Sequence, residues 1–273
     1  MQAQGRWRPP GGILGTIVAQ TASRVDELHR SRATLEARAR SASSPPPLID
    51  ALRHHKVAVI AEVKRRSPSR GEIAGGIEAG TQARAYQRGG ARAISVLTEP
   101  LHFGGSPADL ETVRTQVGIP VLKKDFHLDV LQVLEARSIG ASGLLLIVRA
   151  LEPARLHDLV HAALETGVEP LVEVRDEEEL SRALDTGARV IGVNNRNLET
   201  LEIDPATAER LVPLVPADRI AIAESGIESH DDVERFARAG ADAVLVGSFI
   251  SAATDPVAAV RDLANVPRVG RAG

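Results

Sequence analysis

GADAVLVG (240–247) ends one amphipathic stretch and opens a short aliphatic run, and three further segments repeat this pattern: GGARAISV (89–96), GASGLLLI (140–147) and GARVIGV (187–193). In each, glycine is the residue type that commonly ends a helix, and the residues that follow are typical of strands. The repeats therefore indicate a chain built from successive helix and strand units.

Short apolar runs alternate with longer amphipathic stretches from residue 57 onward. Eight runs are predicted strands: Val57–Lys64, Ala93–Thr98, Ile119–Lys124, Gly143–Val148, Glu169–Val174, Arg189–Asn194, Arg219–Glu224 and Asp242–Gly247. Several are apolar almost throughout, as expected for parallel strands buried on both faces. Eight such units predict an α/β fold, the (β/α)8 TIM barrel, which commonly takes about 250 residues. The alternative is an open doubly wound sheet, but the GxGxxG turn typical of that fold is absent after the first strand.

The barrel is preceded by a segment of different character. Apolar residues at helical spacing predict one or two helices over Ile13–Ala42, the proline-rich SASSPPP (41–47) interrupts them, and Leu48–His55 is expected to be a short helix. The expected organisation is an N-terminus without fixed structure (1–12), a helical extension packed on the barrel (13–55), the barrel (56–264) and a C-terminal tail (265–273).

The composition excludes several classes of function. A formal net charge of −3 provides no general attraction for nucleic acid or an anionic membrane. The chain has no cysteine, and its eight histidines lack paired ligand spacing such as HExxH, so we expect no metal site. Residues 1–12 contain no apolar signal region, and no apolar run approaches the roughly 18 residues of a membrane span, so we expect a cytoplasmic protein.

Polar residues follow the end of every predicted strand, where barrels carry their functional groups. Because residues two apart in a strand share a face, the interior should receive Glu62, Lys64, Lys124, Glu173 and Asn194. The alternative is that strands simply become polar where they reach water. Charged residues recur at interior parity on several strands, however, and such residues are seldom buried alone, which favours a shared site.

Lysine is rare in this chain and its placement is uneven. Only four of the 33 basic residues are lysines, and three of these, Lys64, Lys123 and Lys124, lie at predicted strand ends. Unlike arginine, lysine can exchange a proton once its surroundings lower its pKa, so this placement favours acid–base chemistry. The alternative is that Lys123 and Lys124 form a solvated surface pair. Adjacent strand residues face opposite ways, so at most one points inward, and parity with Leu122 selects Lys124.

Two glycine-containing turns follow the last two predicted strands, at Glu224–Gly226 and Val246–Ser248. Barrels often bind phosphate at this place through backbone N–H groups. The basic, turn-rich loop RRSPSRG (65–71) is either an ordinary flexible loop or a lid that closes over an anionic substrate. The sequence therefore predicts a site for a phosphorylated small molecule.

Seven ordered segments resemble indole-3-glycerol phosphate synthase. They are IAEVKRRSPSRG (60–71), SVLTEPLHFGG (95–105), PVLKKDF (120–126), LVEV (171–174), IGVNNRNLETLEI (191–203), IAESGI (222–227) and VLVGSFI (244–250). The resemblance extends over about residues 13–263 and includes the helical extension.

The resemblance implies a carboxy-lyase of tryptophan biosynthesis that needs no cofactor. Its reaction converts 1-(2-carboxyphenylamino)-1-deoxyribulose 5-phosphate to indole-3-glycerol phosphate with release of CO2 and water. By motif match, Lys124 is the general acid at the ribulose carbonyl, Lys64 holds the substrate carboxylate or phosphate, Glu62 and Glu173 serve the later proton transfers, and Asn194 orients the substrate. Lys64 should lower the pKa of Lys124 while the glutamates oppose it, which leaves the net direction open.

The same resemblance assigns two further groups of residues. Substrate-binding residues are Ser67, Phe103, Phe126, Arg196, Leu198 and Glu224, and phosphate-binding residues are Ser225, Gly226, Gly247 and Ser248. It also suggests association with other enzymes of the tryptophan pathway.

Some positions depart from the pattern of that family, among them His102, Asn195 and the basic pair Arg65 and Arg66. Two other functions stay open: a phosphoribosyl isomerase on the same fold, and a non-catalytic paralogue that acts as a binding partner. An isomerase would not need inward lysines on two strands, and a paralogue would be expected to lose acid–base residues that this chain keeps.

Overall fold

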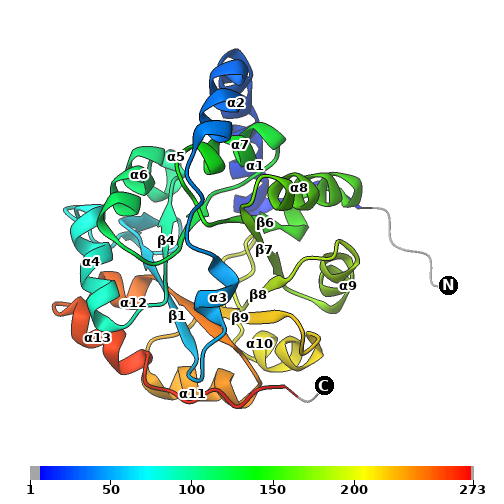
Figure 1. The fold of residues 1–273 in the computed structure, drawn as a ribbon. Coiled ribbons are helices and arrows are strands. Elements are labelled where there is room, and N and C mark those ends of the chain that lie inside the picture. Colours follow the sequence, from blue (N-terminus) through cyan, green and yellow to red (C-terminus); the bar gives the residue numbers. More distant parts are fainter. Residues whose placement is uncertain (1–6, 272–273) are drawn as a thin grey trace.

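A closed barrel of eight parallel strands forms the centre of the protein, and helices surround it (Figure 1). The computed structural model describes residues 7–271. The barrel strands are β1 (Ala58–Val63), β4 (Ala93–Leu97), β5 (Val121–Lys124), β6 (Gly143–Ile147), β7 (Glu169–Val174), β8 (Val190–Asn194), β9 (Ile220–Glu224) and β10 (Ala243–Val246). Each strand pairs with the next along the chain, and β10 pairs with β1. The predicted TIM barrel is confirmed, and the open sheet is excluded.

The predicted strands match the observed ones to within two residues at each end. The glycine signal operates as expected: Gly140, Gly187 and Gly240 have φ of 81°, 77° and 96°, in the left-handed region that glycine adopts without steric cost. A side chain there would strain the backbone, so these glycines end the helix and direct the chain into the strand.

The outer helices follow the barrel strands in turn. They are α4 (Ala79–Gly89), α5 (Pro100–Phe103), α6 (Pro107–Gln116), α7 (Val130–Ser138), α8 (Pro153–Glu165), α9 (Glu177–Asp185), α10 (Ala206–Leu211), α11 (His230–Arg238), α12 (Ser248–Ser251) and α13 (Pro256–Leu263), with short 3-10 turns at Val148–Ala150 and Val212–Leu214. Strand residues alternate between two cores. In β1, Val59 and Ala61 pack against the helices, whereas Ala58 and Ile60 fill the barrel interior. Glu62 continues the inward series.

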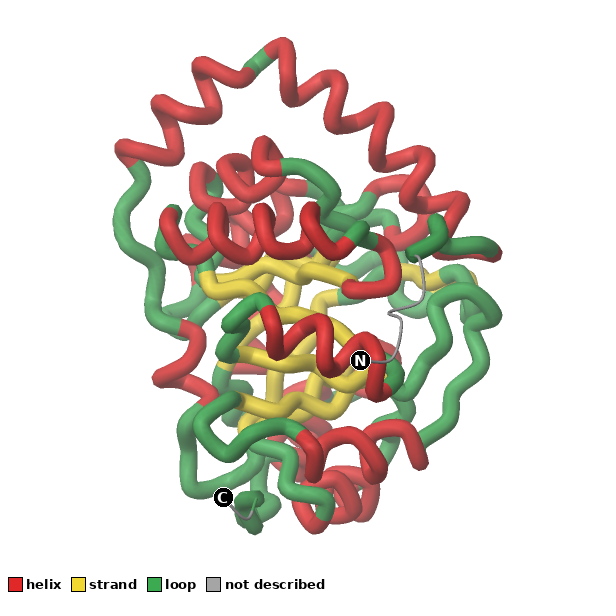
Figure 2. The backbone as a smooth tube through the Cα atoms, turned by 90° about the vertical axis from the view of Figure 1, so that its right-hand side faces the viewer, coloured by secondary structure: helices red, strands yellow, loops and turns green. Residues whose placement is uncertain are grey.

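The N-terminal extension forms α1 (Gly12–Arg30), α2 (Arg32–Ser41) and α3 (Leu48–Leu52). Helices α1 and α2 meet at an angle at the upper edge of Figure 2. Leu14 and Ile17 of α1 and Leu48 and Leu52 of α3 all join the interior core of the barrel. The extension thus supplies apolar side chains that complete the barrel core.

Residues 7–12, which we expected to lack fixed structure, contact the barrel loops, while residues 1–6 of that segment lie outside the described residues. Arg149 donates to the carbonyl of Arg8 at 2.8 Å, and the N–H of Gly11 donates to Glu199 at 2.6 Å. Within residues 7–271, no helix is long and apolar enough to cross a membrane.

Candidate active site

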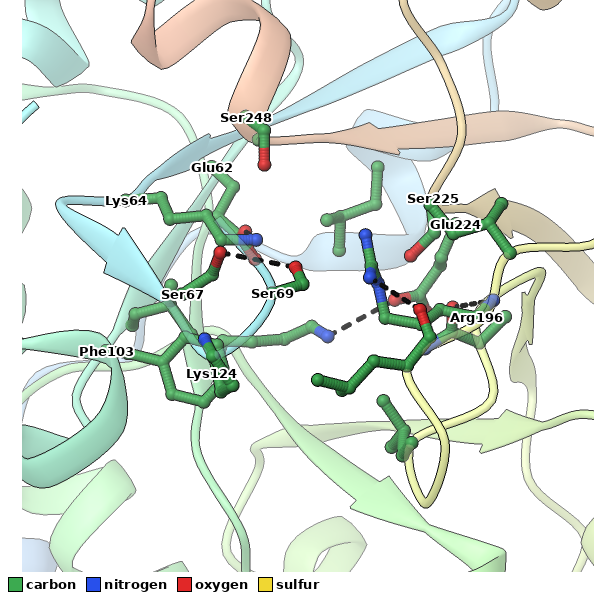
Figure 3. A pocket seen from close by; sticks show the side chains of 18 of the residues that line it. Glu62, Lys64, Ser67, Ser69, Phe103, Lys124, Arg196, Glu224, Ser225 and Ser248 are labelled. Carbon is green, nitrogen blue, oxygen red and sulfur yellow. Dashed lines mark hydrogen bonds and ion pairs between the residues drawn. The ribbon is translucent and has the colours of Figure 1, made fainter. Parts of the chain in front are cut away.

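One cavity opens at the carboxyl ends of the barrel strands (Figure 3). Its lining includes all fifteen site residues predicted above, which come from seven of the eight βα units. Phe103 and Lys64 come from the first two units, Ser248 from the last, and Ile13 and Leu14 of the extension add apolar surface. The structure therefore brings the predicted residues to one place, as strand parity indicated.

Lys124 points into this cavity between two carboxylates. Its Nζ lies 3.2 Å from Glu224 Oε2 and 3.4 Å from Glu173 Oε2. Burial opposes the ammonium, but Glu224, Glu173 and Glu62 outweigh it and raise the pKa of Lys124 above that of an ordinary lysine. The glutamates thus decide the direction of the pKa shift that the sequence left open, and they favour the protonated form of Lys124.

Glu224, predicted to bind the substrate, lies next to Lys124 in the cavity. Burial raises the pKa of its carboxyl above the usual range, Lys124 partly offsets this, and Glu173 adds to it. Glu224 Oε1 is buried without a hydrogen-bond partner among the described residues. A Cβ on Gly192 would lie 2.2 Å from that oxygen, so only glycine at 192 leaves room for it. Strand alternation alone indicates this inward position, because Ile220 and Ile222 lie in the interior core and Glu224 follows them at the same spacing of two residues.

Glu62 and Lys64 form a second ion pair on the opposite side of the cavity. Lys64 Nζ lies 3.3 Å from Glu62 Oε1, and Ser95 Oγ lies 3.4 Å from Glu62 Oε2. A Cβ on Gly247 would come within 2.5 Å of Glu62 Oε1. The glycine of the last turn therefore provides space for the Glu62 carboxylate.

The two glycine-containing turns face the cavity from β9 and β10. Ser225 and Gly226 both have positive φ, 67° and 74°, so their backbone is held in a conformation that serine seldom adopts. Ser248 begins α12 directly after Gly247. Hydroxyl and backbone N–H groups in such turns suit the oxygens of a phosphate.

An aromatic wall closes another side of the cavity. The ring centres of Phe103 and Phe126 are 6.2 Å apart and the rings are tilted by 35°, and Leu198, like Phe103, packs against the interior core that contains Phe126. Lys64 Nζ lies 6.0 Å from the centre of the Phe103 ring. This wall offers an apolar surface suited to an aryl group, and the neighbouring Lys64 ammonium suits a carboxylate attached to such a group.

The comparisons with known proteins agree on one family. A family model described as indole-3-glycerol phosphate synthase matches residues 14–263. A protein of that description from Parafrankia sp. (strain EAN1pec) is 49% identical over 251 residues, which cover 92% of this chain and 93% of that protein. Another from Nocardioides sp. (strain ATCC BAA-499 / JS614) is 50% identical over 259 residues, covering 93% and 98% of the two chains. The chain belongs to the indole-3-glycerol phosphate synthase family.

Among solved structures, 3-hexulose-6-phosphate synthase from Salmonella typhimurium matches with a TM-score of 0.62 and 17% identity, covering 76% of this chain and 97% of that one. At this identity the likeness supports the barrel fold alone. The family assignment rests on the family model and the sequence relatives. Separately, within the described residues no group of three or more His, Cys, Asp or Glu side chains is placed to hold a metal ion.

In this member of the synthase family the first loop is a short hairpin, β2 (Arg66–Ser67) with β3 (Gly71–Glu72). Arg65 anchors its base through a bidentate pair with Asp109, with both N–O distances 2.7 Å. At its tip, Arg70 forms an ion pair with Glu228, which follows the glycine-containing turn after β9. The loop thus lines the cavity and links the end of β1 to the segment that follows β9.

Two residues outside the predicted site, Glu99 and Arg149, support the segments that form it. Glu99 accepts hydrogen bonds from the N–H groups of Leu101, His102 and Phe103 at the start of α5, and so fixes the helix that carries Phe103. Arg149 pairs with Glu199 and ties the N-terminal segment to the β8 loop.

Asn195, where the sequence departs from the synthase pattern, is buried between two loops. Its Nδ2 donates to the carbonyl of Ser225 at 2.9 Å, and its Oδ1 accepts from the N–H of Ala208 at 2.9 Å. Asn195 therefore links the turn after β9 to the start of α10.

Proposed function

We propose that this chain converts 1-(2-carboxyphenylamino)-1-deoxyribulose 5-phosphate to indole-3-glycerol phosphate, CO2 and water, and that Lys124 supplies the first proton. The observation that carries the proposal is the Lys124 ammonium, held between Glu173 and Glu224 inside a cavity that has phosphate turns on one side and an aromatic wall on the other. One end of the substrate is a phosphate and the other is an aryl carboxylate, which matches this asymmetry.

Ring closure needs an acid at the ribulose carbonyl. The aryl carbon that bears the carboxylate attacks the carbonyl carbon, and the Lys124 ammonium protonates the oxygen, which becomes a hydroxyl group. Because the pKa of Lys124 is raised, the lysine is fully protonated before the reaction. A positioned acid of this kind contributes about 10²–10⁴-fold to the rate.

The later steps release CO2 and water. Loss of CO2 returns the electron pair to the ring system, and departure of the hydroxyl with a proton from the neighbouring carbon leaves the indole double bond. We assign the base to Glu173, whose carboxylate adjoins Lys124, and a supporting role to Glu62 on the opposite wall. Glu224, kept neutral at neutral pH by burial, is suited to donate a proton to the departing hydroxyl.

The remaining contacts would orient the two ends of the substrate. Ser225, Gly226, Gly247 and Ser248 are proposed to hold the phosphate with Ser67 above them. Phe103, Phe126 and Leu198 would pack against the aryl ring, and Lys64, Asn194 and Arg196 would hold its carboxylate and the ribulose hydroxyls. Asn194 Oδ1 accepts from the backbone N–H of Arg196 at 2.9 Å, which preorganises this pair.

A product assay tests the proposal against the isomerase alternative. Purified protein is incubated with the carboxyphenylamino substrate, and indole fluorescence and released CO2 are measured together. We expect one CO2 for each indole product formed. An isomerised sugar without indole would contradict the proposal, and no reaction at all would favour the binding paralogue.

On the resemblance alone, we further propose a cytoplasmic location and association with other enzymes of tryptophan synthesis. Size-exclusion chromatography of the purified protein mixed with the enzyme that consumes its product would test the association. Elution of the two at their separate positions would contradict it.

A further inference from the structure

Lys123 lies on the opposite face of β5 from Lys124 and is fully buried, with 0% of its side chain exposed. The alternative that Lys123 and Lys124 form a solvated surface pair is therefore wrong. Lys123 belongs to a group of charged and polar side chains between the barrel and the helices, which we call the Lys123 cluster: Arg24, Lys123, Asp125, His127 and Glu135. The mechanism above uses none of them.

The ammonium of Lys123 has three acceptors around it. Its Nζ lies 2.9 Å from Glu135 Oε2, 3.3 Å from His127 Nε2 and 3.7 Å from Asp125 Oδ2. His127 Nδ1 lies 2.7 Å from the carbonyl oxygen of Leu145, which can only accept, so Nδ1 carries the proton and Nε2 accepts from Lys123. Burial and the neighbouring Lys123 lower the pKa of His127 to about 3, consistent with a neutral ring. The buried cation is therefore paired with two carboxylates and donates a hydrogen bond to the neutral His127 ring.

Asp125 connects this cluster to the candidate active site. Its Oδ1 accepts from Arg24 Nη2 of α1 and from the N–H of Phe126, both at 2.8 Å, and its Oδ2 accepts from Thr98 Oγ1 at 2.6 Å. Burial opposes the carboxylate, but Lys123 and then Arg24 outweigh it and lower the pKa of Asp125 below its usual range. One carboxylate thus holds together the ends of β4 and β5 and the first helix of the extension.

The two neighbours of Asp125 in the chain are Lys124 and Phe126, which both line the cavity. We propose that Lys123 is a positioning residue: its buried ammonium holds Asp125 and the turn after β5, and thereby sets where Lys124 Nζ and the Phe126 ring lie. The proposal rests on the proposed function for its kinetic consequence, but its structural consequence can be measured separately. A displacement of about 1 Å at a reacting group costs on the order of 100-fold in rate.

Lys123→Met tests the proposal, because methionine keeps most of the side-chain volume and removes the charge. Glu135→Gln is the second variant. The Glu135 side chain is 18% exposed, so this substitution should destabilise the fold less than Lys123→Met, while it removes the carboxylate charge closest to the Lys123 ammonium. Arg271→Met is the matched control. Arg271 is a buried cation, paired with Asp242 at 2.8 Å, among residues below the opposite end of the barrel strands.

Two readouts separate positioning from mere stability. With only four lysines in the chain, [13Cε]lysine labelling resolves each signal, and Lys124→Met assigns that of Lys124. We expect Lys123→Met to shift or broaden the Lys124 signal and to lower kcat roughly 10- to 100-fold with KM changed less than about threefold. Glu135→Gln should change both in the same direction but less, and Arg271→Met should lower the free energy of unfolding without changing either.

The outcomes distinguish this inference from the proposed function. If the wild type forms no indole, the proposed function fails, and the Lys124 signal alone decides the inference. If the wild type is active and Lys123→Met leaves both kcat and the Lys124 signal unchanged, the positioning role is overturned. If Lys123→Met does not fold, the same result in Glu135→Gln overturns it. Equal kinetic losses in Arg271→Met would also overturn it, because they would show a general effect of stability.

Discussion

Replacing Lys124 with methionine removes the one cation that lies between Glu173 and Glu224, at 3.4 Å and 3.2 Å from their oxygens. For the reaction, we expect loss of the general acid to lower kcat at least about 10³-fold, which at 1.36 kcal/mol for each factor of ten is about 4 kcal/mol of transition-state stabilisation. The protein should still bind inorganic phosphate, since the ion pairs of Lys124 are with Glu173 and Glu224 and not with the proposed phosphate-binding residues Ser225, Gly226, Gly247 and Ser248. Discontinuous assays of indole product and phosphate titration measure the two effects.

The same substitution has a pH-dependent effect on stability. Removing one partner of a buried ion pair costs about 3–5 kcal/mol when the remaining charge persists, but a carboxylate can take up a proton and reduce this cost. Burial already raises the pKa of Glu224 to about 8 in the wild type, where Lys124 partly offsets it, so without Lys124 this pKa should rise further. Above about pH 8 the folded variant therefore keeps a proton on Glu224 that the folded wild type releases, and the additional loss of stability grows as the pH rises through that range. In the wild type, the pKa of Lys124 is raised in the folded state, so its stabilisation is present throughout this range and is lost only as the pH rises above about 10.4.

We therefore expect Lys124→Met to lose about 3 kcal/mol of unfolding free energy at about pH 9.5 and clearly less at about pH 6. Denaturant unfolding at the two pH values measures the difference. Lys56→Met is the control, because Lys56 bonds to Asn265 near the exposed opposite end of the barrel and should change neither stability nor kcat appreciably. Activity within tenfold of wild type would refute the acid assignment, and an equal loss of stability at both pH values would refute the electrostatic argument.

Three further predictions follow from the same geometry. Gly192→Ala should displace Glu224 from Lys124, because the added Cβ would lie 2.2 Å from Glu224 Oε1, and this displacement should lower kcat by at least about tenfold. Gly118→Ala is the control, because a Cβ there meets nothing within 4 Å and should leave kcat unchanged; equal kcat values in the two variants would refute the predicted clash. If neutral Glu224 donates a proton, wild-type kcat should fall as the pH rises through its raised pKa, whereas Glu224→Gln should be slower and lack that fall; an alkaline limb unchanged in the variant would assign it to another group. Inorganic phosphate should raise the Tm of the wild type and raise it less in Ser248→Ala, and an equal shift in both would place the anion elsewhere.

The sequence alone determined the barrel and most of its inward-facing residues. Helix and strand periodicity, with glycine at the helix ends, were enough to count eight strands and locate them to within two residues. Parity within each strand then brought Glu62, Lys124 and Glu173 to one cavity. These inferences succeed because they depend on local geometry: the alternation of side chains in a strand does not depend on which strands are its neighbours.

Only the tertiary structure decided how the charges interact. Parity directed Lys124 inward, but the raised pKa of that lysine depends on its distances to carboxylates from two other strands. The environment of Lys123 also depends on the tertiary structure. Outward parity on its strand is compatible with a surface lysine, but the Lys123 cluster includes Arg24, which lies about a hundred positions from Asp125 in the chain. Coulomb energies depend on separation and on burial in three dimensions, and neither is encoded in the spacing of residues along the chain.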